Sequence, residues 1–145
     1  MDHAEMIAFV RRHGLAFVAT RGPDGTAQTA HFPVAITDQA ELVLELSRHS
    51  QKYSNIVKFP QVALKVGVDE PISVESEGLA DVLTGPERDR CLRFYFQQFP
   101  AGRERAAQPD IVHVRIRPRW MRVNDLSPES FGVRAIPIEP WADAG

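Results

Sequence analysis

Cysteine is almost absent from this sequence of 145 residues, in which Cys91 stands alone. A single cysteine excludes an internal disulfide and a cysteine-based metal cluster. Its place on the apolar face of a predicted helix indicates a buried, unreactive thiol. The five histidines lack the H-x-x-x-H and H-E-x-x-H spacings of metal sites. Neither a hydrolase triad nor a glycine-rich phosphate loop is found, so those classes of enzyme are not indicated.

Long apolar runs and an excess of one charge are also missing. No run is long enough to cross a bilayer, and the acidic start of the chain with its short apolar part does not resemble a signal peptide. A cytoplasmic protein is therefore the expectation. The formal net charge of -2 argues against a nucleic-acid-binding domain that depends on basicity. With 43% hydrophobic and 25% charged residues, the composition is that of an ordinary globular domain.

The stretch 42–64 carries the clearest pattern in the chain. Leucines at positions 42, 44 and 46 alternate with other residues, as in a half-buried strand. Ser50 then suits a helix N-cap, Pro60 ends the helix, and alternation resumes from residue 62. The helix is predicted to bury one apolar stripe, made of Tyr53, Ile56 and Val57.

Periodicity and turn residues place the remaining elements. Helices are predicted over residues 2–13 and 84–99, and strands over 15–20, 26–36, 72–83 and 111–123, with a bulge at Gly78 and a loop over 101–110. Six strands joined mostly by short turns must pair antiparallel, so the fold class is mainly β with flanking helices, a barrel or curled sheet. Residues 1–125 form one domain, and residues 126–145 form a tail that packs on the domain or on a dimer partner through Ile136, Ile138 and Trp141.

Positive side chains recur along one face of the predicted strand 111–123. We expect them to pair with acidic residues on the strand 72–83, although recognition of an anionic substrate is the alternative. The cationic residues are His113, Arg115, Arg117 and Arg119, and the acidic ones are Glu75, Glu77 and Asp81.

Charge at the start of the helix that follows Ser50 breaks a local rule. Arg48, His49 and Lys52 crowd a helix N-terminus, where the partial positive charge of the backbone disfavours cations. A bound anion would compensate, because free N–H groups, the Ser50 hydroxyl and the Lys52 ammonium together suit a phosphate. The alternative is that all these cations are simply solvated.

The order and spacing of several motifs resemble the pyridoxamine 5′-phosphate oxidase-like family. The pieces that carry the resemblance are Pro23-Asp24-Gly25, Ser50-Gln51-Lys52-Tyr53-Ser54-Asn55-Ile56, Pro60-Gln61-Val62-Ala63-Leu64, Glu77-Gly78, Tyr95-Phe96-Gln97-Gln98-Phe99-Pro100 and the run from Arg115 to Asp125. The resemblance implies a six-stranded antiparallel split β-barrel that forms a homodimer. It also implies one flavin mononucleotide (FMN) at each of two equivalent interface sites.

The resemblance also implies which residues would contact FMN. Ser50 and Lys52 match the family's phosphate-binding stretch, whereas Gln51 replaces an arginine and Leu46 replaces a threonine. Losing such polar contacts would weaken phosphate binding. The complete set of candidate cofactor contacts is His31, Phe32 and Pro33 at the flavin ring, Leu46, Ser47, Ser50, Gln51 and Lys52 at the phosphate, and Trp120 and Arg122 from the partner subunit.

The implied activity is that of an FMN-dependent oxidoreductase acting on an unidentified small molecule. The substrate site of the authentic oxidase has no match here, so that reaction is not assigned. His31 is either a residue beside the flavin or a packed side chain, and Trp120 covers either the cofactor or a dimer contact. The alternatives are a non-catalytic flavin-, deazaflavin- or haem-binding protein, a stress-related protein, or a purely partner-binding domain.

Overall fold

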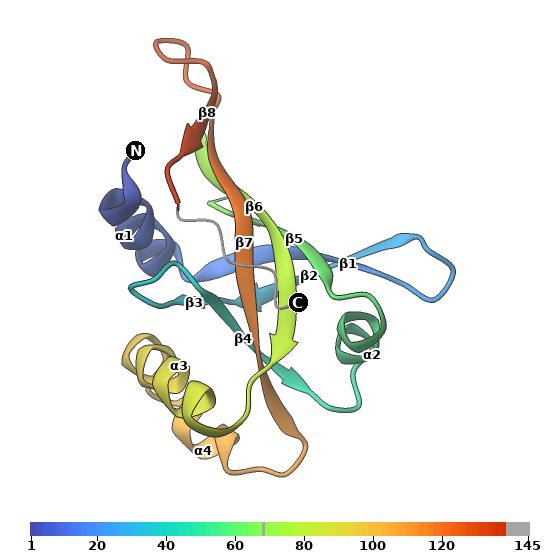
Figure 1. Cartoon of the computed structure of the whole chain (residues 1–145). Helices are drawn as coiled ribbons and strands as arrows, with labels where there is room; N and C mark the ends of the chain where they lie inside the picture. Colours follow the sequence, from blue (N-terminus) through green and yellow to red (C-terminus); the bar gives the residue numbers. More distant parts are fainter. Residues whose placement is uncertain (68, 139–145) are drawn as a thin grey trace.

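The computed structural model describes residues 1–67 and 69–138, which form an antiparallel sheet flanked by helices (Figure 1). The described helices are α1 (His3–His13), α2 (Gln51–Lys58), α3 (Gly85–Gln98) and α4 (Gly102–Ala106). The described strands are β1 (Leu15–Arg21), β2 (Ala27–Pro33), β3 (Ala35–Ile36), β4 (Leu42–Ser47), β5 (Gln61–Val66), β6 (Ile72–Val82), β7 (Ile111–Asp125) and β8 (Gly132–Ile136).

The sheet curls into a barrel that is left open on one side. Its strands follow the order β2-β1-β5-β6-β7-β4-β3, with β8 paired to the outer part of β7. β2 and β3 lie at opposite ends of this order but are consecutive in the chain, and β2 also contacts β4. The bend between β2 and β3 thus brings the two ends of the sheet towards each other, and the predicted split β-barrel is confirmed.

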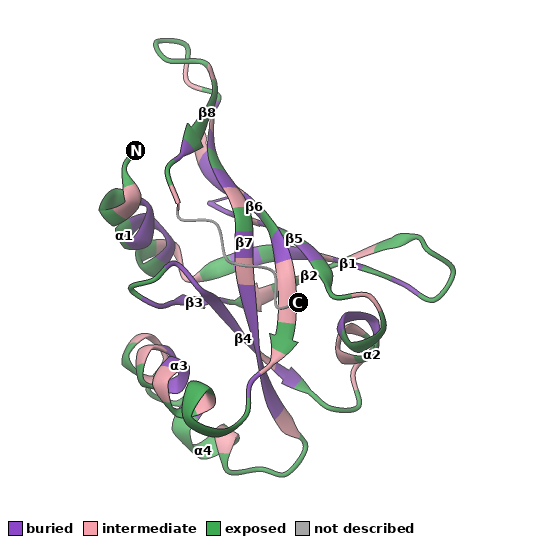
Figure 2. Cartoon of the chain, in the orientation of Figure 1, coloured by how far each residue is buried: buried purple, intermediate pink, exposed green. Residues whose placement is uncertain are grey.

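Apolar side chains from the strands fill the barrel, and α1 and α2 close it from outside. Met6, Phe9 and Val10 of α1 and Ile56 of α2 are at most 3% exposed and belong to this main core. Figure 2 shows the buried residues concentrated on β4, β5 and β7 and on the inner face of α1. The helices α1 and α2 and the strands β1 and β5 therefore each bury one apolar face and leave the other in solvent, as their periodicity predicts.

The ends of α1 and α2 have the predicted caps. The Asp2 carboxylate accepts from the Glu5 N–H at 2.8 Å, and Gly14 adopts the left-handed conformation that ends α1. The Ser50 hydroxyl accepts from the Tyr53 N–H at 3.2 Å at the start of α2. These three caps set where the helices begin or end, and the sequence predicted all of them.

Gly78 marks a bulge in the pairing of β6 with β7, as predicted. The pairing register shifts between Glu77 and Gly78. A Cβ at residue 78 would lie only 2.2 Å from the Arg117 carbonyl oxygen, so no side chain fits at this bulge.

The strand predicted over residues 26–36 is instead two strands, β2 and β3. Pro33 has no N–H, and the Val34 N–H leaves the ladder to donate to the Gly14 carbonyl at 3.0 Å. The bend at these residues carries the chain from one end of the sheet to the other.

Other boundaries also differ from the prediction. Residues 102–106, predicted as loop, form α4, and Arg105 there contacts Glu45 at 3.1 Å. Residues 132–136 of the predicted tail form β8 on the edge of β7. The described sheet consequently has eight strands where six were predicted. Ile136 is buried in the main core, whereas Trp141 lies outside the described residues.

The acidic partner expected for His113 is wrong, since neither of its ring nitrogens has a hydrogen-bond partner among the described residues. His113 and Arg115 are also buried, with 1% and 3% of their surface exposed. A second apolar cluster explains this, because α3 packs its Cys91, Leu92 and Tyr95 over the outer face of β4 and β7. Cys91 is buried, as predicted. The sequence pattern shows that one face of β7 is polar but not that a helix covers it.

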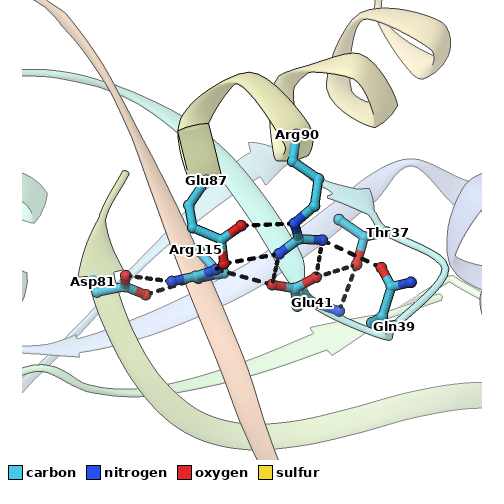
Figure 3. A network of polar contacts seen from close by, with 7 residues as sticks. All are labelled: Thr37, Gln39, Glu41, Asp81, Glu87, Arg90 and Arg115. Carbon is cyan, nitrogen blue, oxygen red and sulfur yellow. Dashed lines mark hydrogen bonds and ion pairs between the residues drawn. The ribbon is translucent and has the colours of Figure 1, made fainter. Parts of the chain in front are cut away.

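Buried ion pairs fasten α3 to the sheet (Figure 3). Arg115 pairs with Asp81 at 2.8 Å, as predicted, and also contacts Glu87 and the fully buried Glu41. Arg90 of α3 contacts Glu41 at 2.7 Å. Burial raises the pKa of Glu41, but hydrogen bonds from Arg90 and Thr37 outweigh that effect and hold the pKa below its usual value. Arg115 of β7 is therefore paired with three carboxylates at once, those of Glu41, Asp81 and Glu87.

Candidate functional site

The turn between β4 and α2 leaves anion-binding groups unused. The Ser50 N–H donates to the Ser47 carbonyl at 3.0 Å, and this turn delivers the chain to the first turn of α2. The N–H groups of Gln51 and Lys52 have no partner within the described residues, as helix geometry requires for a first turn. Two backbone donors at the positive end of α2 are thus available to an anion.

The Ser50 hydroxyl already donates one hydrogen bond and accepts another within the protein. It donates to the Ser47 carbonyl at 2.8 Å and accepts from the Tyr53 N–H. The Ser47 hydroxyl in turn accepts from the His49 N–H at 3.2 Å. Both serines therefore shape the turn, and a phosphate contact from Ser50 would require its hydroxyl to leave the Ser47 carbonyl.

The basic side chains around this turn outnumber the acidic side chains that pair with them. His49 lies 3.2 Å from Asp110, and both side chains are largely exposed. Arg48 is exposed and Lys52 is half-buried, and neither side chain forms an ion pair in the described part of the chain. Positive charge therefore gathers at a helix N-terminus with a single acidic partner nearby, which leaves it free to attract an anion.

Gln51 and Leu46, the departures from the family pattern, point away from this turn. The Gln51 side-chain amide donates to the Asn55 carbonyl oxygen at 2.9 Å, one helical turn along α2. Leu46 is 3% exposed and lies in the main core, so only its backbone faces the turn.

Asn55 is a residue that the sequence reasoning missed. Val57 was predicted to be buried but is 60% exposed, whereas Asn55 is 3% exposed. Its amide donates to Thr20 at 3.0 Å and to Gln28 at 2.8 Å. The signal that could have found it is its place within the S-x-K-x-x-N motif, on the face next to Ile56.

His31 lies on the exposed face of the β1–β2 hairpin. Its ring centroid is 3.7 Å from that of Phe17, which is 39% exposed. Pro33 shares this exposed face, whereas Phe32 points the other way and packs against the main core. Leu15 is also exposed on this face, opposite Pro33, and apolar side chains grouped on a surface, unlike a single one, are typical of a site that a ligand or partner covers.

Trp120 and Arg122 line a cavity of about 330 Å³ on the outer face of β1, β5, β6 and β7. Arg122 lies over the Trp120 ring at 4.4 Å and contacts Glu75 at 3.0 Å. Lys65 contacts the same carboxylate at 3.4 Å, and Glu77 and Phe17 complete the wall. The cavity combines an aromatic wall with paired charges, so it suits a small planar polar molecule.

The structure thus sorts the candidate residues into two groups. Ser47, Ser50, Gln51 and Lys52 share the β4–α2 turn. Trp120 and Arg122 share their cavity with Phe17, which contacts His31. Among residues 1–67 and 69–138 of one chain, no hydrogen bond or ion pair joins the two groups.

The split antiparallel barrel defines the class of fold to which this protein belongs. The sequence profile of the family described as pyridoxamine 5′-phosphate oxidase matches residues 3–125. The chain therefore belongs to the pyridoxamine 5′-phosphate oxidase family, and its fold is the FMN-binding split barrel of that family. Among curated proteins none matches the sequence.

Solved structures share this fold at low sequence identity. A conserved hypothetical protein from Mycobacterium tuberculosis is 23% identical, with a TM-score of 0.71 and coverage of 100% of this chain and 95% of that one. General Stress Protein 26 from Bacillus anthracis is 20% identical, with a TM-score of 0.68 and coverage of 83% and 92%. A haem binding protein from Mycobacterium smegmatis is 14% identical, with a TM-score of 0.76 and coverage of 92% of this chain but 57% of that one.

Among residues 1–67 and 69–138, no group of three or more histidine, cysteine or acidic residues is arranged to hold a metal ion. None of the helices in these ranges combines the length and apolar character needed to cross a membrane.

Proposed function

We propose that this chain binds FMN and acts as a homodimeric flavoprotein with one cofactor at each of two equivalent interface sites. The observation that carries the proposal is the start of α2. There the free N–H groups of Gln51 and Lys52 and the unpaired cations of Arg48 and Lys52 occur in a chain of this family.

These residues fit a flavin phosphate. A phosphate is a multiply charged acceptor, and helix N-termini with adjacent lysine or arginine supply the donors and the positive charge that it needs. Gln51 contributes only its backbone N–H, since its side chain is bound to Asn55. We therefore expect weaker phosphate binding than an arginine at that position would give.

The exposed faces of the sheet supply surroundings for the flavin ring. His31 and Pro33 would face the ring from one protomer, and Trp120 and Arg122 of the second protomer would close the site. In such a dimer the β4–α2 turn of one protomer would meet Trp120 and Arg122 of the other, so these two groups of candidate residues need not be joined within one chain. The same dimer would explain why Phe17 is open to solvent in the isolated protomer.

The reaction that follows from this site is an oxidation or reduction of a small molecule. When bound, FMN supplies the redox chemistry, and the protein supplies position and electrostatics. The cavity beside Trp120 would admit the substrate, with Lys65 and Arg122 on its polar side and Phe17 on its apolar side.

A visible absorption spectrum of the purified protein with added FMN tests this function. We expect binding with a change in flavin fluorescence, followed by bleaching of the bound flavin on addition of NADH or NADPH. A protein that binds no FMN at high micromolar concentration would contradict the proposal.

A second candidate is a non-catalytic cofactor-binding protein of the same fold. The engaged hydroxyl of Ser50 and the engaged side chain of Gln51 favour it, because both leave fewer contacts for a phosphate. A relative of similar fold is described as a haem binding protein. Tight binding of haem, or of flavin that neither nicotinamide cofactor reduces, would favour this second candidate.

A further inference from the structure

Asn55 is a buried amide whose polar groups are all used. Both hydrogens of its side-chain nitrogen are donated, to the Thr20 hydroxyl at 3.0 Å and to the Gln28 carbonyl oxygen at 2.8 Å. Its own carbonyl oxygen accepts from the Gln51 side chain at 2.9 Å. Burying an amide costs free energy unless such partners are present, so this arrangement is specific to these residues.

The position itself does not favour asparagine. Asn has a low helix propensity and competes for backbone hydrogen bonds within a helix. Its neighbour Ile56 lies in the main core, so an apolar side chain at residue 55 would also be buried. A polar residue at this place therefore has a role that packing alone does not explain.

The partners of Asn55 belong to separate parts of the proposed cofactor site. Gln51 lies between Ser50 and Lys52 in the first turn of α2. Thr20 and Gln28 are directly opposite each other on β1 and β2, and His31 follows on β2. The side-chain amide of Asn55 thus donates to Thr20 and Gln28 on the hairpin. Its oxygen accepts from Gln51, in the helical turn that offers the anion site.

We propose that Asn55 is a positioning residue that fixes the first turn of α2 relative to the β1–β2 hairpin. It touches no ligand and acts through Gln51 on one side and Gln28 on the other. The inference rests on the proposed binding of FMN, because its purpose is to hold the phosphate-binding turn at a fixed distance from the strand that faces the flavin ring. Such a link matters because a small displacement of a positioned charge removes most of its effect.

The test compares FMN with riboflavin, which has the same ring but no phosphate. Flavin fluorescence titrations would give both affinities for the wild type, Asn55→Leu and Ile56→Val, a matched control that changes packing on the same helix. We expect Asn55→Leu to weaken FMN binding about tenfold, the effect of one lost phosphate contact, and to leave riboflavin binding unchanged. Ile56→Val should leave the ratio of the two affinities as in the wild type.

Each other outcome decides against the inference. If Asn55→Leu lowers both affinities equally, or neither, Asn55 is only structural and the positioning role is wrong while FMN binding stands. If the wild type does not prefer FMN to riboflavin, the proposed function fails and the positioning role with it. Should Asn55→Leu fail to fold by circular dichroism, Gln28→Leu removes one acceptor of the same amide and must lower the same ratio.

Discussion

At the scale of single residues, His113 is the clearest departure from ordinary chemistry. It is 1% exposed and packs edge-on against Tyr95, with ring centroids 5.4 Å apart. Neither ring nitrogen has a hydrogen-bond partner in the part of the chain that the structure describes. Burial lowers the pKa of His113 to about 4, although the charge of Glu45 opposes the shift. The folded protein therefore holds this imidazole neutral.

Acid should destabilise the fold through this histidine. In the unfolded chain its pKa is about 6.5, so the unfolded state takes up a proton before the folded state does. The stabilising contribution is complete above pH 6.5 and is lost as the pH falls towards 4. Between pH 7 and pH 5 the loss is about 2 kcal/mol.

Urea unfolding at these two pH values checks the prediction. His113→Phe keeps the aromatic packing and removes the titrating group, so its stability should fall by about 2 kcal/mol less than that of the wild type over this range. Equal losses in the two proteins would show that His113 does not titrate on unfolding.

At the scale of elements, the ion network decides how α3 is held. Arg115 is 3% exposed and contacts Asp81, Glu41 and Glu87. Hydrogen bonds from Arg90 and Arg115 lower the pKa of Glu87 to about 2, so this carboxylate stays charged at neutral pH. The network is therefore a link between charged groups from three elements.

Replacing Arg115 should loosen α3. Arg115→Met leaves Glu41 buried with only Arg90 as its cationic partner, and removing one member of a buried pair costs about 3 kcal/mol. Thermal unfolding would measure the loss, with Arg93→Met, a change at an exposed arginine of α3, expected to lie within about 0.5 kcal/mol of the wild type. A similar stability of both variants would contradict the role assigned to the network.

The elements also show what the sequence can and cannot reveal. The sequence predicts features that depend on neighbouring residues, such as the Asp2 cap of α1, the Ser50 cap of α2 and the bulge at Gly78. The sequence does not predict burial that depends on packing against other elements. His113 is covered by α3, a separate element whose packing on β7 no local pattern shows, and the partners of Asn55 lie far away in the sequence, on β1 and β2.

At the scale of the whole molecule, a single protomer leaves part of its sheet uncovered. Leu15 and Phe17 of β1 are 42% and 39% exposed, and Phe17 borders the cavity of Trp120. Under the proposed function a second protomer covers this face and completes the cofactor site. The sequence indicated the candidate residues through its family resemblance, but alternation along a strand does not say which face meets a partner.

A charge on this face should separate the protomers. Phe17→Glu would place a carboxylate in the interface, where its burial without a partner is unfavourable. Sedimentation velocity should show a dimer for the wild type and a monomer for this variant, with FMN binding weakened as well. Leu126→Glu, on a residue 66% exposed after β7, should remain dimeric. If the Phe17→Glu variant remained a dimer, the interface would have to lie on another face of the protomer.

Under the proposed function, the positive charge at the start of α2 holds the phosphate of a flavin. The FMN affinity of Lys52→Ala, compared with that of Lys58→Ala in the last turn of the same helix, tests this role. We expect an affinity about tenfold lower for Lys52→Ala, the loss of one charge-assisted contact, and no change for Lys58→Ala. Equal FMN affinity of both variants and the wild type would show that the flavin phosphate does not bind at the start of α2.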